Sequence, residues 1–485
     1  MDDGTAKYFF LNGIAALIML TLAEGCRVSH PGQYTLLPKL AIEARVTMPT
    51  DSTDSVYAEL RWKDDVIAFY ESNNHELVWY DSASKPLPVR DSLIDVICKA
   101  RYFGLLPQNY HIDELKKLVD STLPIDLVRT DALVTDAFFG FTADIKYGRT
   151  MRMSENRLDS ASVPLLRQVL DGSNLRSALH SMEPPSSQYQ SLKVVLKTIL
   201  DTTELEVRQR ILNGETDDSL PVIKIIKSIE INLEKRRLER DFSPGGKYIY
   251  VNIPSFMLDV VDGDKSVLKS KVIVGTQTNP TPEITSLVEC IVIYPYWHVP
   301  RKISVEEYLP ILQRDTSFLT RNNFDVLDRK GKVLSADSID WKKFSKNYFP
   351  VSLRQHEGKE NSLGVVKFVF DNPYAVFLHD TNAKYLFRNR TRAFSHGCIR
   401  VEKAVELAHY LFTGDLKKKS KVIDKYIVQE QRQTLSLRQP IPIYLRYFTC
   451  EVIDDRLYQY QDIYNKDAAI MLVLYSAPTI GDRIE

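Results

Sequence analysis

Apolar residues recur at helical spacing through most of the first half of the chain. Segments 93–100, 132–147 and 191–200 each place apolar side chains three and four residues apart, which would make one face of a helix apolar. We find no internal repeat among these segments. The pattern therefore predicts a mainly helical domain over residues 56–242, which we interpret as a scaffold.

Short runs rich in β-branched and aromatic residues replace this pattern after the Ser-Pro-Gly-Gly sequence at 243–246. The runs stand at 248–253, 256–261, 270–275, 288–294, 365–370 and 375–379. Such runs, bounded by turn residues, are typical of strands. We expect a mostly-β domain in two parts, 243–299 and 361–425, and a C-terminal segment, 426–485, that packs on it.

The stretch between the two groups of strands has a different character. Residues 300–350 are mixed and polar, with a helix-like run at 304–314. We interpret residues 300–360 as an inserted capping subdomain. The predicted fold class is therefore α+β multidomain, with a helical scaffold domain and a mostly-β domain that carries the insertion.

The first 26 residues have the pattern of an export signal. Lys7 stands in a short polar start, the apolar run 8–23 follows, and the small residues Ala23 and Gly25 stand near its end. The run is shorter than the roughly 20 residues that a membrane-spanning helix needs. We expect a protein of the periplasm or cell envelope, with an uncleaved membrane anchor as the alternative.

Cys26 introduces the question of a lipid anchor. The sequence Leu22-Ala23-Glu24-Gly25-Cys26 resembles a lipoprotein signal, in which the cysteine is lipidated and becomes the mature N-terminus, although Glu24 fits that pattern poorly. Residues 27–55 are rich in Pro, Thr, Ser and Asp and lack sustained periodicity, which predicts a flexible tether.

Length and charge restrict the classes of protein. A chain of 485 residues exceeds what one hydrophobic core usually organises, so we expect more than one folding unit. Lys plus Arg and Asp plus Glu both number 63, and this balance gives no global positive field for nucleic acid or anionic lipid. We therefore expect no nucleic-acid partner.

The five cysteines, at positions 26, 98, 290, 398 and 450, form no CxxC pair and no closely spaced framework. Disulfides are therefore not expected to hold the fold. Cys290 stands in the apolar run 288–294 and Cys98 in the helix-like segment 91–100, and Cys450 is interpreted in the same way. These surroundings favour buried small hydrophobes over reactive thiols. Cys398 has different surroundings.

Cys398 ends a Ser395-His396-Gly397-Cys398 sequence that precedes a helical pattern over 401–412. A helix N-terminus and a nearby imidazolium both favour thiolate over thiol, which is how proteins make a nucleophilic cysteine. Gly397 allows a sharp bend whose amides would form an oxyanion hole. His379, at the end of a strand, is the candidate base.

Two alternatives remain open on these residues alone. A lone cysteine beside a histidine is more often structural than catalytic. A zinc site made of His379, His396 and Cys398 would lack the Cys-x2-Cys or His-x3-His spacing that supports such sites, so we predict no metal.

The string LHDTNAKYLFRNRTRAFSHGCIRV (378–401) resembles the catalytic domain of the L,D-transpeptidases, which is of the YkuD type. That family has a histidine ending a strand, a variable stretch, and then Ser/Thr-His-Gly-Cys followed closely by Arg or Asn. The resemblance implies that Cys398 is the nucleophile and His379 the general base. It further implies a supporting site made of Ser395, His396, Gly397 and Arg400.

The resemblance extends over most of the chain beyond the signal. Residues 247–258, 272–284, 294–300 and 354–381 resemble large multidomain periplasmic members of the family, and 69–81, 100–111 and 141–149 resemble the scaffold that precedes their catalytic domain. Many of those members carry a three-helix peptidoglycan-binding module, but the stretch from Leu200 to Ser228 is too short for one. We infer that this module is absent.

The resemblance implies a peptidoglycan L,D-transpeptidase without cofactors, which forms 3→3 cross-links through a cysteine thioester and releases D-alanine. Its partners would be tetrapeptide stems, as donor and acceptor, and carbapenem β-lactams as covalent inhibitors. An L,D-carboxypeptidase, a cysteine wall hydrolase and a non-catalytic wall scaffold are the alternatives. Papain-like hydrolases usually place cysteine before histidine, the reverse of the order here.

Two further assignments stay open at this stage. Arg400 would either pair with a substrate carboxylate in a bidentate fit or brace the turn. Tyr294, Tyr296 and Trp297 would form either a platform beside the peptide or part of the core.

Overall fold

The structure is a computed structural model that describes residues 46–152, 161–239, 245–263, 265–415 and 417–475. The predicted export signal, Cys26 and most of the predicted tether lie outside these residues. Within the described part of the chain, no helix is both long and apolar enough to cross a membrane.

The tether ends earlier than the sequence predicted. Met48 is buried and its amide donates to the His75 carbonyl at 2.7 Å, while Thr47 forms an isolated β-bridge with Glu76. Only Met48 and the partly buried Val46 anchor this stretch to the core, which is too little to give the sequence a visible period. Residues 46–55 therefore belong to the helical domain.

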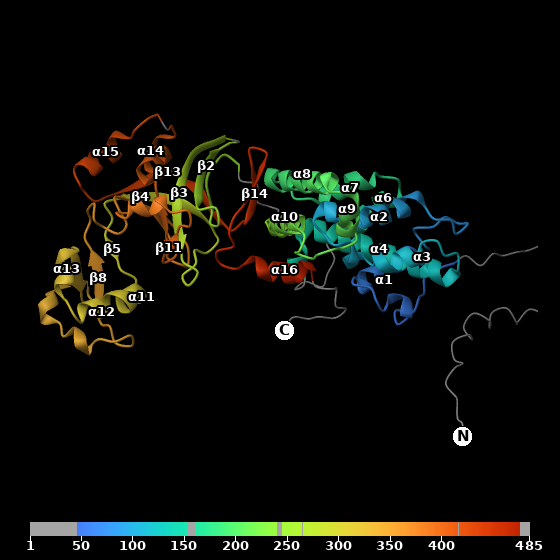
Figure 1. Cartoon of the computed structure of the whole chain (residues 1–485), viewed down its shortest axis with the longest axis horizontal. Coiled ribbons are helices and arrows are strands. Elements are labelled where there is room, and N and C mark those ends of the chain that lie inside the picture. Colours follow the sequence, from blue (N-terminus) through green and yellow to red (C-terminus); the bar gives the residue numbers. More distant parts are fainter. Residues whose placement is uncertain (1–45, 153–160, 240–244, 264, 416, 476–485) are drawn as a thin grey trace, which may run out of the picture. The chain divides into compact units, whose positions relative to one another are not determined.

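The helical domain is built around α4 (Pro124–Tyr147), which is buried on all sides over most of its length. Pro124 stands at the first helical turn, where its missing N–H costs nothing, and the helix ends before Gly148, whose φ is +79°. The other helices surround α4 (Figure 1). They are α1 (Lys63–Glu71), α2 (Pro88–Cys98), α3 (Ile112–Leu118), α5 (Arg149–Arg152), α6 (Ser162–Leu170), α7 (Leu175–Met182), α8 (Ser187–Thr202), α9 (Leu205–Leu212) and α10 (Pro221–Leu238), with 3-10 turns η1 (Ser55–Tyr57), η2 (Ala100–Phe103) and η3 (Pro107–Tyr110).

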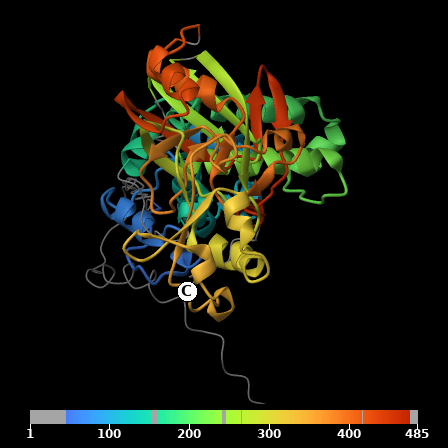
Figure 2. The same ribbon diagram turned by 90° about the vertical axis from the view of Figure 1, so that its left-hand side faces the viewer.

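The second domain is a nine-stranded sheet with the order β11-β3-β12-β10-β9-β4-β13-β1-β2. Strand β3 pairs with β2 along its first half and with β12 and β11 along its second, so the sheet closes on itself. The C-terminal β13 pairs in parallel with β1 from the start of the domain. Figure 2 shows red segments from the C-terminal part of the chain beside the green strands that begin the domain. The strands are β1 (Lys247–Asn252), β2 (Met257–Asp262), β3 (Lys265–Gly275), β4 (Ile284–Ile293), β9 (Val366–Phe370), β10 (Leu378–His379), β11 (Ala393–Ser395), β12 (Ile399–Val401) and β13 (Gln433–Arg446).

The helix predicted over 401–412 begins later than expected. Residues Ile399–Val401 form strand β12, and α14 (Ala404–Thr413) starts after it. Val401 on β12 and Leu407 on α14 are buried in the same core. For this reason Val401 matched the apolar spacing of the helix that follows. The core of the sheet domain is further covered by α15 (Lys421–Val428) beside β4, and η7 (Lys384–Arg388) lies beside β3.

The segment predicted as a cap has its own small core, formed around Trp341 and Leu353. It contains a four-stranded sheet of order β5-β8-β6-β7. A π-helical turn, η4, interrupts its first helix. The elements are β5 (Trp297–His298), α11 (Arg301–Ile303), η4 (Ser304–Tyr308), α12 (Leu309–Leu312), α13 (Ser317–Arg321), β6 (Phe324–Leu327), β7 (Val333–Leu334), η5 (Ala336–Ser338), η6 (Trp341–Lys343) and β8 (Ser352–Gln355).

The sequence predicted only that the C-terminal segment packs on the sheet domain. In the structure it also forms part of the sheet and contacts the helical domain. It supplies β13 to the sheet. Strand β14 (Cys450–Ile453) then pairs with β15 (Arg456–Gln459) and contacts helices α8 and α10, while α16 (Asp467–Tyr475) contacts α10 and α5. Asn232 donates to the Thr449 hydroxyl at 2.9 Å, and Gln188 donates to the Val452 carbonyl at 2.7 Å. Between α8 and α10 the chain forms only α9 and its flanking turns.

Candidate active site

Two short parallel strands bring the candidate base and nucleophile to one face of the sheet. In the β10–β12 pair, His379 stands opposite Arg400, and the Ile399 amide donates to the Phe377 carbonyl at 3.0 Å. Paired residues of neighbouring strands point to the same side, and residues two apart along a strand share a face. Cys398, two residues before Arg400, therefore lies diagonally across from His379.

The Ser395–Cys398 turn is closed by the side chain of Ser395. This serine is buried, donates to the Cys398 carbonyl at 2.5 Å and accepts from the Gly397 amide at 3.1 Å. Gly397 has φ of +113°, where a side chain would strain the backbone, so the glycine is required for the turn. Ser395 and Gly397 thus shape the turn that presents the thiol.

The expected oxyanion hole needs a correction. The Gly397 amide already donates to Ser395, so it does not point freely toward a substrate. The Cys398 amide has no acceptor among the described residues. The amide of the nucleophile itself is therefore the better candidate to hold a developing oxyanion.

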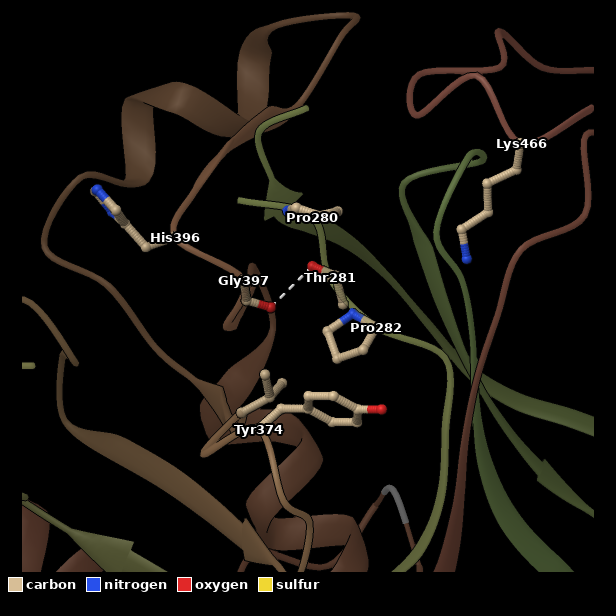
Figure 3. Close-up of a pocket in the computed structure, with 8 residues that line it drawn as sticks. Pro280, Thr281, Pro282, Tyr374, His396, Gly397 and Lys466 are labelled. Carbon is tan, nitrogen blue, oxygen red and sulfur yellow. Dashed lines mark hydrogen bonds between the residues drawn. The ribbon is translucent and has the colours of Figure 1, made fainter. Parts of the chain in front are cut away.

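Thr281 and Tyr464 brace the turn from outside the motif, and the sequence reading missed both. The buried Thr281 hydroxyl donates to the Gly397 carbonyl at 2.8 Å and accepts from the Gly275 amide at 2.9 Å (Figure 3). The Tyr464 hydroxyl donates to the Gly275 carbonyl at 2.8 Å and accepts from the Thr281 amide at 3.1 Å. The one sequence signal for Thr281 is its position inside residues 272–284, a segment that resembles the family.

Replacing Thr281 by valine is expected to destabilise the catalytic domain and lower activity. Valine keeps the shape but leaves the Gly397 carbonyl and the Gly275 amide without their partner, at about 1–3 kcal/mol each. Chemical denaturation followed by circular dichroism measures the loss. Thr278→Val is the matched control, because Thr278 is exposed in the same loop and bonds only to Thr276 and Asn279. Equal stability of the two variants would contradict the bracing role.

The helix dipole does not activate Cys398 in the way the sequence suggested. Strand β12 separates the thiol from α14, and the influence of a helix end falls off within about one turn. Burial raises the pKa of the Cys398 thiol, while the Phe377 amide and the cations Lys367 and Arg400 act in the opposite direction. The thiol is therefore protonated at neutral pH in the free protein.

His379 is buried and neutral. Burial, followed by the charge of Arg400, lowers the pKa of its imidazole to about 3. Its Nδ1 lies 2.5 Å from the Asp380 carbonyl oxygen, which can only accept, so Nδ1 carries the proton. Nε2 therefore carries no proton, as a general base requires.

The His396 ring points away from Thr281, Pro282 and Tyr374, as Figure 3 shows. Its Nε2 lies 2.5 Å from Glu307 in the cap, and Lys302 of the cap donates to the Asn279 side chain at 2.6 Å. His396 thus joins the Ser395–Cys398 turn to the cap.

A pocket of about 370 Å³ lies beside the turn (Figure 3). Its lining residues come from three loops and the C-terminal segment: Pro280, Thr281, Pro282, Tyr374, Val376, His396, Gly397 and Lys466. The pocket lies next to Gly397, and neither Cys398 nor His379 is among its lining residues.

The aromatic residues before the cap divide between two roles. Tyr294 is fully buried in the sheet domain, and Trp297 packs on Tyr308 and Phe324 inside the cap. The ring of Tyr296 lies 4.8 Å from the Arg354 guanidinium. Tyr294 and Trp297 are therefore packing residues.

Metal-ligating side chains do not gather at this site. In the part of the chain that the structure describes, no group of three or more His, Cys, Asp or Glu residues could hold a metal ion. The four described cysteines are free thiols. Cys450 is buried, and Cys98 and Cys290 are half-buried, with Cys98 packed against the core of the helical domain.

Comparison with known proteins identifies both domains. Residues 246–423 match the L,D-transpeptidase catalytic domain of the YkuD type, and residues 64–196 match a scaffold domain. A Haemophilus influenzae protein named "Putative L,D-transpeptidase" is 30% identical over 320 residues, which cover 62% of this chain and 64% of that protein. The chain thus spans a little under two thirds of that curated relative. The matches confirm the resemblance and the predicted fold class.

Proposed function

We propose that this chain, which carries an L,D-transpeptidase catalytic domain, is a peptidoglycan L,D-transpeptidase that forms 3→3 cross-links between stem peptides. The observation that carries the proposal is the placement of Cys398 and His379 on one face of β10 and β12, inside the matched domain. The activity of the matched family supports peptide stems as substrates.

The first step is acyl transfer to sulfur. The Cys398 thiol passes its proton to Nε2 of His379 as Sγ attacks the carbonyl of residue three of a tetrapeptide stem. The carbon–nitrogen bond to the terminal D-alanine breaks, and the imidazolium returns the proton to the leaving amine. A thioester on Cys398 and free D-alanine result.

The second step transfers the acyl group to an amine. The side-chain amine of residue three of a second stem loses a proton to His379 and attacks the thioester, which frees the Cys398 thiolate. The product joins residue three of one stem to residue three of the other. Water in place of the amine would give an L,D-carboxypeptidase.

The test is incubation of the purified protein with tetrapeptide muropeptides, followed by mass spectrometry. The proposal predicts 3→3 dimers and one released D-alanine for each dimer. Tripeptides without dimers would support the carboxypeptidase, and an unchanged substrate would refute both activities.

The rate of alkylation of Cys398 should rise continuously with pH and should not be constant at acidic pH. Because the pKa of the Cys398 thiol is raised, the thiolate forms only at a higher pH than for an ordinary cysteine. The pKa of His379 is lowered to about 3, so no imidazolium is present at pH 5–7 to stabilise a thiolate. The rate should therefore keep rising with pH beyond pH 8. Peptide mass spectrometry after timed iodoacetamide treatment isolates Cys398 from the other thiols. A constant rate between pH 5 and 7 would show a preformed ion pair and contradict this description.

The proposal includes export to the periplasm or cell envelope, which the pattern of residues 1–26 supports. If Cys26 carries a lipid, Cys26→Ser should move the protein from the membrane fraction to the soluble fraction. Unchanged partitioning would leave cleavage at a plain signal or retention of an anchor as the explanation.

A further inference from the structure

Lys367 lies in the same row of side chains as the two charged or titratable residues beside the nucleophile. Strand β9 is antiparallel to β10 and places Lys367 opposite His379, which in turn stands opposite Arg400 on β12. Residues paired across neighbouring strands share a face. Lys367, His379 and Arg400 therefore cross the active-site face of the sheet in one line.

The side chain of Lys367 leans from this row toward Cys398. Its ammonium lies 3.5 Å from the centre of the Phe377 ring. Phe377 stands directly before β10, and its carbonyl accepts from the amide of Ile399, the residue after Cys398. The charge of the Lys367 ammonium also acts on the Cys398 thiol, so the two groups are neighbours on this face of the sheet.

The charge of Lys367 has no acidic counterpart in the described part of the chain. The groups that act on its charge are the thiols of Cys398 and Cys290, and no carboxylate is among them. Burial lowers the pKa of this ammonium, because a partly desolvated cation is costly until an anion compensates it. By contrast, Lys359 near the same edge is paired with Glu430 at 2.8 Å.

A donor stem supplies an anion at this position. The carboxylate of its terminal residue is three bonds from the carbonyl carbon that Cys398 attacks, so the two lie within about 5 Å of each other. An ammonium beside the thiol can therefore bind that carboxylate while sulfur bonds to the carbonyl.

We infer that Lys367 binds the C-terminal carboxylate of the donor peptide and so selects stems in which one residue follows the bond that breaks. This inference rests on the proposed function. It makes Lys367 a substrate-binding residue that distinguishes a tetrapeptide end from an internal peptide bond or a longer stem. The side-chain carboxylate of residue three has the same chemistry and is the competing source of the anion.

The test combines three donors with variants of Lys367. The donors are a tetrapeptide acid, its C-terminal carboxamide, and a tetrapeptide acid whose residue-three side-chain carboxylate is amidated. Loss of a charge-assisted contact is expected to lower kcat/KM for acylation about 10- to 100-fold. Wild-type protein should lose this factor with the C-terminal carboxamide, and Lys367→Met should lose it with the acid.

The decisive result is the combination of the two changes. Lys367→Met should show no further loss with the C-terminal carboxamide, because the partner of the carboxylate is already gone. Lys367→Arg should keep most of the preference for the acid. Lys269→Met, at an exposed lysine on β3, should behave as wild type. Methionine keeps the aliphatic stem over Phe377, and an unchanged unfolding midpoint verifies the fold.

Two results would overturn the inference. One is that the losses of kcat/KM caused by Lys367→Met and by the C-terminal carboxamide multiply, as they do for two independent changes. The other is that amidation of the residue-three side chain, and not of the C-terminus, removes the effect of Lys367→Met.

Binding of the same donors to Cys398→Ser, with and without Lys367→Met, separates this inference from the proposed function. If the same preference appears in Kd while wild-type protein transfers nothing, the function fails and the inference stands. If transfer occurs without the preference, the inference fails and the function stands. If neither binding nor transfer is found, both are refuted.

Discussion

Cys398→Ala is expected to abolish both peptide transfer and covalent capture of a carbapenem. A carbapenem presents a strained carbonyl to the active site, and opening of its ring by Sγ leaves one acyl group on the thiol. Alanine has no nucleophile at this position, so both reactions lose their first step. Intact-protein mass spectrometry should show one added carbapenem on the wild-type chain and none on the variant.

Cys290→Ala is the matched control for this experiment. Cys290 is a half-buried thiol on β4, and burial raises its pKa as it does that of Cys398. It lacks the neighbouring His379 and the turn that presents Cys398. The Cys290 variant should form the adduct at the wild-type rate. An adduct that survives in Cys398→Ala would show that another thiol is the nucleophile.

His379→Ala is expected to lower the rate of transfer about 10²- to 10⁴-fold, the usual range for a lost general base. With Nε2 gone, no group receives the thiol proton as Sγ attacks, and none returns it to the leaving amine. Single-turnover release of D-alanine measures this loss, and circular dichroism verifies the fold.

Simple alkylation provides an internal check on that role. Because His379 is neutral in the free protein, its loss should change the rate of iodoacetamide alkylation at high pH far less than the rate of transfer. His409→Ala is a matched control, since His409 on α14 is also buried and its Nδ1 accepts from the Ser420 amide, away from Cys398. Near-normal transfer in His379→Ala would exclude it as the base.

The predictions that succeeded rest on long periodic segments. The apolar spacing over 132–147 lies within α4, and the β-rich run 288–294 overlaps β4. In a long segment the period of the apolar residues predicts which face is buried, because that face must be covered by another element. The change of pattern near residues 243–246 likewise coincided with the start of the matched catalytic domain.

The failures concern short elements and contacts that are remote in sequence. Strand β12 has three residues, too few to separate it from the helix pattern that follows. Thr281 is 116 residues from Gly397, and Tyr464 is 189 residues from Gly275, so no local pattern relates them. Lys367 alternates with apolar residues as any residue on the open face of a strand would. Only the register of the sheet places it opposite His379.

The most direct test of the proposed nucleophile is capture of the acyl-enzyme. The protein is mixed with a tetrapeptide donor without an acceptor, quenched with acid, and digested for peptide mass spectrometry. The predicted result is a thioester-linked tripeptide on the fragment that contains Cys398, with D-alanine released in equal amount. Release of D-alanine with no acyl group on Cys398, or with the acyl group on another residue, would contradict the mechanism.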